Sequence, residues 1–196
     1  MTDLKKIGEE VKGCANCQLC AGRTHAVPGV GHERAKILFV GEGPGRDEDL
    51  QGKPFVGAAG KFLTELIESI GLERGDVFIT NVVKCRPPNN RDPFPEEIDA
   101  CWPYLVRQIK LIKPELIVTL GRHSMYKFLP DLKISEVHGK PKVCKGIWQE
   151  KQVYLPLYHP AVALYDPRKR EVLLNDFKVI PLVLKKLSQS KQENDS

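Results

Sequence analysis

Short apolar runs alternate with more polar segments along most of the chain. Each run is bounded by charged, glycine or proline residues and has the length of a buried strand. These runs predict strands over residues 35–41, 76–83, 115–121 and 152–160. Helices are expected between and after them, over residues 58–72, 95–112 and 171–187. The alternation predicts an α/β fold, a three-layer α/β/α sandwich around a mainly parallel central sheet.

Two of the expected helices carry local signals of where they begin or end. In the helix over 58–72, apolar residues recur at helical spacing, and Gly71 is the expected C-cap. Pro95 and the two glutamates after it suit a first helical turn, where proline is tolerated and acids are favoured. The sequence predicts a single domain over residues 1–187, followed by a polar tail, 188–196, that is expected to be disordered.

Composition narrows the class of protein. The chain has 196 residues, of which 41% are hydrophobic and 28% charged, as is ordinary for a soluble globular domain. No apolar stretch has the length of a signal peptide or a membrane span, so we expect a cytoplasmic protein with reduced thiols. The six cysteines are then better explained as metal ligands or free thiols than as disulfides.

The net charge of +5 belongs to the predicted domain, because Lys191 in the tail is outweighed by Glu193 and Asp195. A basic body fits a polyanionic partner such as nucleic acid, and many metabolic enzymes are equally basic. Charge alone therefore leaves the partner open.

The segments at the ends of the predicted strands hold most of the candidate chemistry. In open parallel sheets, ligands bind at the carboxyl ends of the strands. The segments at these ends are GEGPG (41–45), NVVKCRPPNNRDP (81–93), GRHS (121–124) and YHPA (158–161). We therefore expect Glu42, Asn81 and His159 to lie at the same edge of the sheet.

The GEGPG turn lacks the pattern of a phosphate-binding loop. A dinucleotide fingerprint would need glycine where the chain has Arg46, and a Walker pattern would need glycine in place of Phe55. Pro44 also removes a backbone N–H that an anion would use. What remains is a tight turn of little bulk with one carboxylate, Glu42. Such a turn suits either a structural role or the close approach of a small ligand.

Asn81 and His159 each admit a structural and a functional interpretation. An amide at the end of a strand suits a cap, and it also offers the donor and the acceptor that a base edge needs. A histidine there suits the surface, a metal ion or hydrogen-bond donation. The loop after Asn81 contains Lys84, Arg86 and Arg91, which suit either a phosphate backbone or solvent.

The other histidines show no metal-ligand spacing, and we interpret them as ordinary. They are His25, His32, His123 and His138. Arg122 and His123 directly follow the third predicted strand and remain candidates for phosphate contact.

Four cysteines fit a metal centre by number. They are Cys14, Cys17, Cys85 and Cys101. Four thiols suit tetrahedral zinc and a [4Fe–4S] cluster equally. Cys20 completes an even C-x2-C-x2-C spacing, but a ferredoxin run would need a further cysteine where the chain has Thr24. Cys144 is isolated, and we expect it to be a free buried thiol.

Several segments together resemble the iron–sulfur uracil-DNA glycosylases known as family four. They are CANC (14–17), FVGEGPG (39–45), GKPFVGAAGKFL (52–63), ITNVVKCRPPNNRDP (79–93) and YHPA (158–161). Their order and spacing are far more specific than any one of them. The resemblance implies the uracil-DNA glycosylase fold. It also implies a monofunctional hydrolase of base excision repair, which flips uracil out of DNA and cleaves the N-glycosidic bond to leave an abasic site.

The resemblance also implies roles for individual residues. The ligands of a structural [4Fe–4S] cluster would be Cys14, Cys17, Cys85 and Cys101. The uracil pocket would be formed by Glu42, Gly43, Glu48, Phe55, Asn81 and His159. DNA would contact the loop that contains Arg86, Asn90 and Arg91. Cys20 has no counterpart among the ligands.

In this scheme His159 donates a hydrogen bond to uracil O2, where negative charge develops as the base leaves. Asn81 pairs with O4 and N3–H, a pattern that cytosine reverses, and Phe55 stacks on the ring. Glu42 positions or activates the water that attacks C1′, or stabilises the cationic sugar. Glu48 or the neighbouring turn is the candidate for excluding the methyl group of thymine.

Two other classes of function share parts of this pattern. A non-catalytic nucleic-acid-binding module would keep the cluster and lose the pocket, which the presence of Glu42, Phe55, Asn81 and His159 disfavours. A nucleotide-metabolising enzyme would use the GEGPG turn beside a structural zinc ion. The leading hypothesis is a monomeric enzyme without a membrane partner, which acts on uracil in single- or double-stranded DNA.

Overall fold

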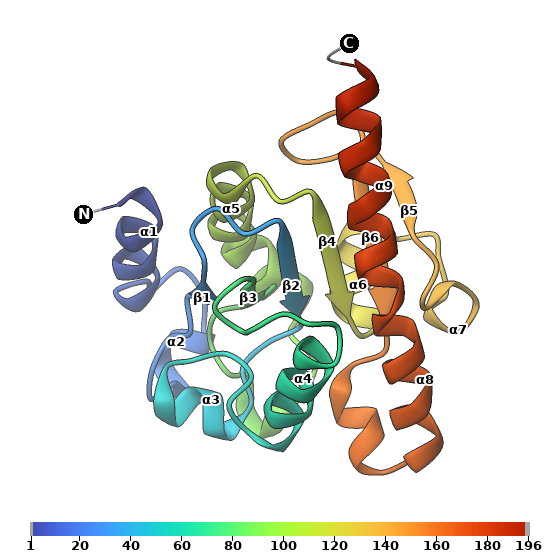
Figure 1. Cartoon of the computed structure of the whole chain (residues 1–196). Coiled ribbons are helices and arrows are strands. Elements are labelled where there is room, and N and C mark those ends of the chain that lie inside the picture. The colour runs from blue at the N-terminus through green and yellow to red at the C-terminus, as the bar shows by residue number, and fades with distance from the viewer. Residues whose placement is uncertain (1, 195–196) are drawn as a thin grey trace.

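The computed structural model describes residues 2–194 and shows a central twisted sheet (Figure 1). Within those residues the sheet has six strands in the order β1-β3-β2-β4-β6-β5. They are β1 Val30–Gly31, β2 Ile37–Gly41, β3 Phe78–Asn81, β4 Leu116–Leu120, β5 Lys142–Cys144 and β6 Gln152–Leu157. β2, β3, β4 and β6 run parallel, and the edge strands β1 and β5 are antiparallel to their neighbours. The parallel strands are the ones predicted from apolar runs, and the mainly parallel sheet is confirmed.

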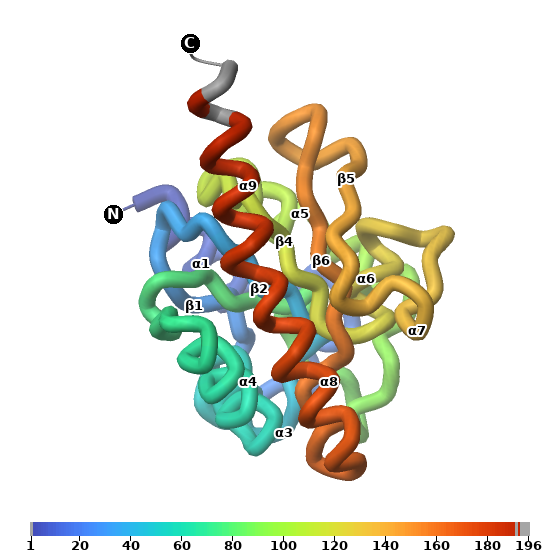
Figure 2. The backbone as a smooth tube through the Cα atoms, turned by 45° about the vertical axis from the view of Figure 1, so that its right-hand side comes forward, coloured from blue at the N-terminus to red at the C-terminus, as the bar shows by residue number. Residues whose placement is uncertain are grey.

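Successive side chains of a strand point to opposite faces of the sheet, and each face has its own apolar core. Leu38 and Val40 of β2 pack into one core, and Ile37 and Phe39 pack into the other. Helices α1 (Asp3–Lys12) and α5 (Pro95–Ile112) cover the first core. The second core is covered by α4 (Ala58–Glu68), α8 (Pro167–Phe177) and α9 (Val179–Asn194). Figures 1 and 2 show α9 and α5 on opposite sides of the sheet, which confirms the three-layer sandwich.

The shorter helices lie in the connections. They are α2 Leu19–Gly22, α3 Arg46–Gln51, η1 Pro88–Asn90, α6 Arg122–Phe128, α7 Ile134–Val137 and η2 Pro160–Leu164. The apolar pattern predicted none of these, nor α1, β1 and β5. Except for α1, which has ten residues, these elements are too short to show a period and depend on packing against the rest of the fold.

Two predicted helix boundaries can be compared with the structure. α5 begins at Pro95 as predicted, and Glu97 accepts a hydrogen bond from the backbone N–H of Phe94 (2.7 Å). α4 ends at Glu68, earlier than predicted, and Gly71 adopts a φ of +77° in the turn that follows rather than at the C-cap.

The single helix expected over 171–187 is instead two helices that meet at Lys178. Pro181 lacks the N–H that a continuous helix would bond back to the carbonyl of Phe177. The second helix therefore starts at Val179 and places this proline in its first turn, where proline is tolerated.

The expectation of a disordered tail over 188–196 is not met as far as Asn194, because α9 extends to that residue. Leu184 and Leu187 pack against the second core and hold the preceding turns of this helix. Residues 195 and 196 lie outside the described residues.

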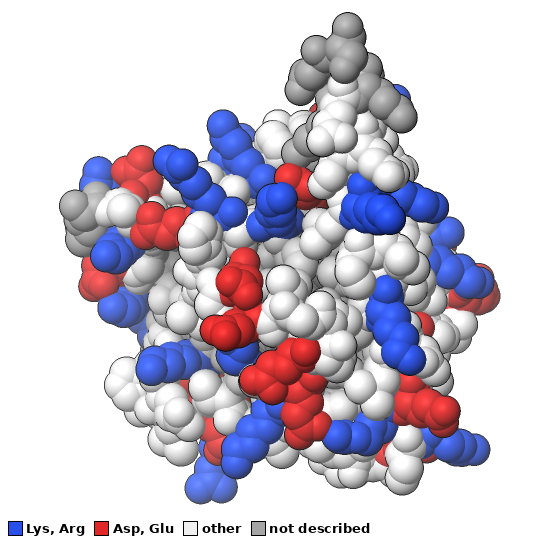
Figure 3. Space-filling view, in the orientation of Figure 1, with Lys and Arg blue, Asp and Glu red and all other residues white. Residues whose placement is uncertain are grey.

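The carboxyl ends of β2 and β4 point toward the bottom of Figure 1, and β3 and β6 run parallel to them. The strand-end segments therefore meet at that edge. Basic and acidic side chains are interspersed on the face shown in Figure 3, so the net charge of +5 is not concentrated there. No helix in the described part of the chain is long and apolar enough to cross a membrane.

Candidate active site

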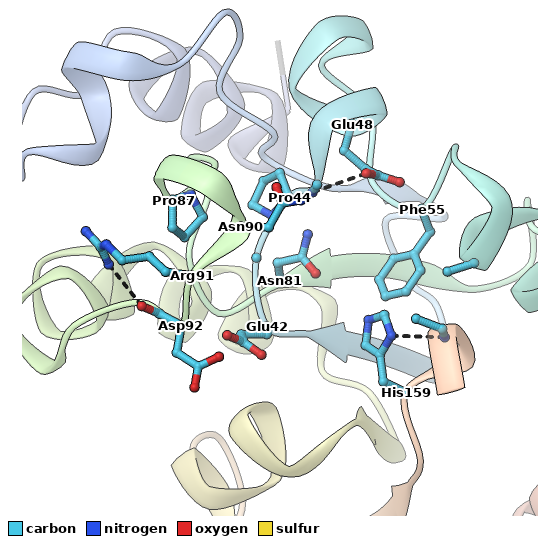
Figure 4. Close-up of a pocket in the computed structure, with 14 residues that line it drawn as sticks. Glu42, Pro44, Glu48, Phe55, Asn81, Pro87, Asn90, Arg91, Asp92 and His159 are labelled. Atoms are coloured by element: carbon cyan, nitrogen blue, oxygen red, sulfur yellow. Dashed lines mark hydrogen bonds between the residues drawn. The ribbon is translucent and has the colours of Figure 1, made fainter. Parts of the chain in front are cut away.

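A cavity of about 380 Å³ opens at the carboxyl ends of β2 and β3 (Figure 4). Its wall includes all the residues for which the family resemblance implies a place in a uracil pocket, namely Glu42, Gly43, Glu48, Phe55, Asn81 and His159. The loop after β3 completes the wall with Asn90, Arg91 and Asp92. Segments far apart in the sequence thus meet in one cavity, because they all follow parallel strands.

Asn81 is the last residue of β3 and is only 2% exposed. Its side-chain Oδ1 has no hydrogen-bond partner among the described residues. Gly41 lies opposite Asn81 in the sheet, and a Cβ atom there would overlap Oδ1. A buried acceptor without a partner costs free energy, so this amide is suited to bind a ligand that enters the cavity.

Phe55 is held in an unusual backbone conformation, with a φ of +52°. Its ring is 6% exposed and stacks on His159, with ring centroids 5.5 Å apart. Two glycines make room for it. A Cβ atom at Gly60 would overlap the carbonyl of Phe55, and one at Gly41 would lie 2.8 Å from its ring. The flat face of Phe55 is therefore fixed beside Asn81 by the backbone around it.

The Glu48 carboxylate joins two sides of the cavity. It accepts hydrogen bonds from the backbone N–H of Gly45 in the turn (3.1 Å) and from those of Val56 (2.9 Å) and Gly57 (3.1 Å) after Phe55. With its oxygens held in this way, Glu48 connects the GEGPG turn to the segment that carries the aromatic ring.

His159 follows β6 and is neutral over the ordinary pH range. Burial lowers the pKa of its imidazole to about 4, although the nearby Glu48 charge opposes this shift. Nδ1 accepts a hydrogen bond from the backbone N–H of Ala161 (3.2 Å), so the proton of the neutral ring is on Nε2. The ring faces the cavity between Asn81 and Glu42 (Figure 4). His159 is therefore a hydrogen-bond donor toward a bound ligand.

Burial also shifts the pKa of Glu42, but upward rather than downward as in His159. Burial and, to a smaller extent, the Asp92 charge raise the pKa of its carboxyl to about 7, and Arg122 opposes the rise. No described residue donates a hydrogen bond to this carboxylate, which leaves its oxygens available to water. His123 Nε2 lies 4.0 Å from Glu42 Oε2. His123 was expected to be ordinary or to contact phosphate, and the segment GRHS that contains it was among those expected at this edge of the sheet.

The cysteines form a second cavity, away from the first. Cys14, Cys17, Cys20, Cys85 and Cys101 all line it. Arg23 Nη1 donates a hydrogen bond to Cys85 Sγ (3.0 Å), and the backbone N–H of Lys84 donates one to Cys101 Sγ (3.2 Å). The four thiols predicted to act together therefore meet in the fold, and Cys20 meets them too.

Comparison with known proteins places this geometry in a family. A family model described as the uracil DNA glycosylase superfamily matches residues 28–179. A type-4 uracil-DNA glycosylase from Sulfurisphaera tokodaii is 56% identical over 187 residues, which cover 92% of this chain and 84% of that protein. The chain belongs to the type-4 group of this superfamily. Type-4 uracil-DNA glycosylases of Archaeoglobus fulgidus and Thermotoga maritima are 54% and 43% identical, and each match covers 92% of this chain.

One expectation for the loop after β3 of this type-4 protein is wrong. Lys84 was a candidate for contact with phosphate, but it is 1% exposed. Its Nζ donates hydrogen bonds to Thr80 Oγ1 (2.6 Å), to the backbone carbonyl of Asn81 (2.8 Å) and to Gln108 Oε1 (2.9 Å). Because each of these contacts is internal, Lys84 supports β3 rather than facing DNA.

The other basic residues of this loop lie nearer the surface. Arg86 Nε donates a hydrogen bond to Asn90 Oδ1 (2.7 Å), and Asn90 is exposed. Arg91 forms two hydrogen bonds with the Glu97 carboxylate (2.6 and 2.8 Å) and lies over the Phe94 ring. The loop is therefore fixed at the mouth of the cavity of this type-4 protein.

Asp92 and Cys144 also depart from the sequence interpretation. Asp92 was given no role, yet it contributes to the pocket wall and lies 3.2 Å from His123 Nε2. The sequence NNRDP (89–93) does not indicate which of its two charged residues faces the cavity.

Cys144 is a free thiol as expected but is exposed rather than buried, because β5 is an edge strand.

Proposed function

We propose that this protein is a monofunctional uracil-DNA glycosylase. It flips uracil out of DNA and hydrolyses the N-glycosidic bond to leave an abasic site, as the first step of base excision repair. The observation that carries the proposal is the buried amide of Asn81, whose Oδ1 has no partner, beside the face of Phe55 and the neutral imidazole of His159. A base in a duplex is inaccessible to such a pocket, so the nucleotide must leave the stack.

Asn81 supplies the choice of base. Its Oδ1 accepts the N3–H of uracil, and its Nδ2 donates to O4. Cytosine presents the reverse pattern, which would leave the buried amide mismatched at a cost of about 1–3 kcal/mol for each group. Stacking on Phe55 contributes roughly 1–3 kcal/mol for any base and therefore adds affinity without selecting uracil.

Exclusion of thymine requires a rigid wall near C5 of the base. Glu48 and the GEGPG turn suit this role, because the three backbone hydrogen bonds to the Glu48 carboxylate hold both together. A methyl group on C5 of thymine could enter only if this wall moved and those hydrogen bonds broke.

His159 stabilises the departing base. As the C1′–N1 bond breaks, its electron pair stays with uracil, and negative charge develops on O2. The Nε2–H of a neutral imidazole donates to that oxygen without a change of protonation state. Since the pKa of His159 is about 4, this donor is present throughout the neutral range.

Glu42 completes the hydrolysis. A water molecule forms the new C1′–O bond, and its proton passes to the Glu42 carboxylate. The same negative charge stabilises the cationic sugar that forms as the base leaves. Both actions require the ionised carboxylate, so activity should rise with pH as Glu42 loses its proton, near the pKa of about 7.

DNA is held at the mouth of the cavity by the loop after β3. Arg86, Asn90 and Arg91 are the residues that we assign to this contact, and they act on the phosphate backbone irrespective of sequence. The hydrogen bond between Arg86 and Asn90 supports the assignment, because it fixes the loop before DNA arrives. The same loop accepts single- or double-stranded uracil-containing DNA.

The residues present fit a [4Fe–4S] cluster bound by Cys14, Cys17, Cys85 and Cys101. The donors from Arg23 and Lys84 to the sulfur atoms suit anionic thiolates. Cysteine sulfur atoms that bind one zinc ion lie within about 4 Å of one another. Among the described residues, no three cysteine sulfur atoms all lie within 4.8 Å of one another. The wider arrangement favours a cluster over zinc. The cluster supplies a structural cross-link and no step of the hydrolysis.

We infer that the protein acts as a monomer in the cytoplasm. One chain provides the whole wall of the cavity, which supports a monomeric enzyme. The six cysteines form no disulfide among the described residues, which suits a reducing compartment.

The test is incubation of freshly purified, brown protein with single- and double-stranded oligonucleotides that contain one uracil, followed by alkaline cleavage. We expect strand scission at the uracil and none in matched oligonucleotides with thymine or cytosine there. Intact uracil strands after treatment with brown, folded protein would contradict the proposed function.

A further inference from the structure

Glu42 has charged neighbours at the rim of the cavity that were given no role in binding uracil. Asp92 comes from the loop after η1, and Arg122 and His123 come from the first turn of α6. Atoms Glu42 Oε2, Asp92 Oδ2 and His123 Nε2 all lie within 4.8 Å of one another. Arg122 Nη2 is 3.9 Å from Asp92 Oδ2, and Arg122 Nε donates a hydrogen bond to His123 Nε2 (3.0 Å).

Two carboxylates and an imidazole are typical ligands for a divalent cation. In this cluster, however, the positively charged Arg122 already lies beside one of the carboxylates. The Arg122 guanidinium lies beside Asp92 and donates to the His123 nitrogen that a metal ion would need. Burial, together with Arg122, lowers the pKa of His123 against the opposing effect of Asp92, which favours the neutral imidazole. The charges that act on Glu42 from this side are therefore one anion, Asp92, and one cation, Arg122.

The other ionisable groups of the cavity are already satisfied. Glu48 accepts three backbone hydrogen bonds, and His159 is neutral. Arg91 is paired with Glu97, and its guanidinium points away from Glu42 (Figure 4). Asp92 and Arg122 are 62% exposed, so substitution of either removes a charge without creating a buried gap.

We propose that Asp92 and Arg122 are positioning residues that set the ionisation of Glu42 from the exposed rim of the cavity, with Asp92 favouring the protonated carboxyl and Arg122 the carboxylate. The inference rests on the proposed function, in which the Glu42 carboxylate must be ionised. A second negative charge nearby makes Glu42 a stronger base, which suits proton transfer from water near neutral pH. It also delays ionisation, so activity is lost sooner as the pH falls. Arg122 limits that loss.

The experiment is the rate of uracil excision from a single-stranded oligonucleotide, in single turnover, from about pH 5 to about pH 9. Asp92→Asn removes the negative charge at constant size, and Arg122→Gln removes the positive charge. Asp76→Asn is the matched control, because Asp76 is an exposed acid before β3, at the opposite edge of the sheet.

We expect the acidic limb of the pH–rate profile to move to lower pH in Asp92→Asn and to higher pH in Arg122→Gln, while Asp76→Asn follows the wild type. At about one pH unit below the wild-type limb, a shift of about half to one pH unit makes Asp92→Asn about two- to five-fold faster than the wild type. A role limited to folding or loop structure would lower the rate without moving the limb in opposite directions. Superimposable limbs in the wild type and both variants would overturn the inference.

A second measurement separates this inference from the proposed function. The Glu42 carboxyl can be titrated by NMR in protein labelled with ¹³C-glutamate, with Glu42→Gln to assign the signal. We expect its midpoint to fall in Asp92→Asn and to rise in Arg122→Gln, whether or not the protein excises uracil. An unchanged midpoint in both variants overturns the inference even where excision is observed.

Discussion

At the scale of single residues, Glu48 stabilises both sides of the cavity, because its carboxylate accepts three backbone hydrogen bonds across it. Hydrogen bonds to a charged group contribute about 1.5–3 kcal/mol each. In Glu48→Gln, one carboxylate oxygen is replaced by an NH2 group that faces a backbone N–H. We expect the free energy of unfolding to fall by about 1–3 kcal/mol. The rate of uracil excision should fall more than ten-fold, since Phe55 and the turn lose their connection.

Asp47→Asn is the control for this change. Asp47 is an exposed acid next to Glu48 on α3, and its substitution should leave both quantities close to the wild type. Urea denaturation and single-turnover excision measure the two effects. Equal behaviour of the two variants would show that the connection through Glu48 is not required.

The residues at strand ends could be predicted from sequence, but the residues around them could not. Asn81 and His159 were found because parallel strands bring their carboxyl ends together whatever the details of packing. The burial of Lys84 depends on Thr80 and Gln108, which belong to different elements. The approach of Asp92 to Glu42 depends on how the loop after β3 folds back. Contacts of this kind have no signature in a local pattern.

At the scale of elements, the start of α4 determines where Phe55 lies. Alanine normally stabilises a helix by about 1 kcal/mol relative to glycine. At Gly60, however, the added Cβ atom would overlap the backbone carbonyl of Phe55. We expect Gly60→Ala to lower the free energy of unfolding by about 1–3 kcal/mol and to impair uracil excision, because the strained segment before α4 must shift.

Gly8 in α1 provides the matched comparison, because the nearest atoms to an added Cβ there are those of Pro28, at 3.9 Å. Gly8→Ala should therefore raise the free energy of unfolding by about 1 kcal/mol and leave excision unchanged. Thermal or urea unfolding of both variants checks the opposite signs. Stabilisation by Gly60→Ala as large as that by Gly8→Ala would show that α4 does not constrain Phe55.

At the scale of the whole molecule, the cysteine cavity joins parts of the chain that are far apart in the sequence. Cys14 and Cys17 lie between α1 and α2, Cys85 lies just after β3, and Cys101 lies on α5. The strand that ends at Asn81 thus leads directly into this cavity. A cluster bound there would hold the N-terminal segment against the loop that leaves the active site.

This arrangement predicts different outcomes for two neighbouring cysteines. Cys17→Ser removes a proposed ligand, so we expect colourless protein, a lower midpoint of thermal unfolding and faster proteolysis of the N-terminal segment, since a structural metal centre contributes directly to folding. Cys20→Ser should stay brown and unfold like the wild type, although Cys20 lines the same cavity. Iron and sulfide analysis, the visible spectrum and thermal unfolding distinguish the two. A colourless Cys20→Ser variant beside a brown Cys17→Ser variant would reverse the assignment of the fourth ligand, because five thiols meet there and four suffice for the cluster.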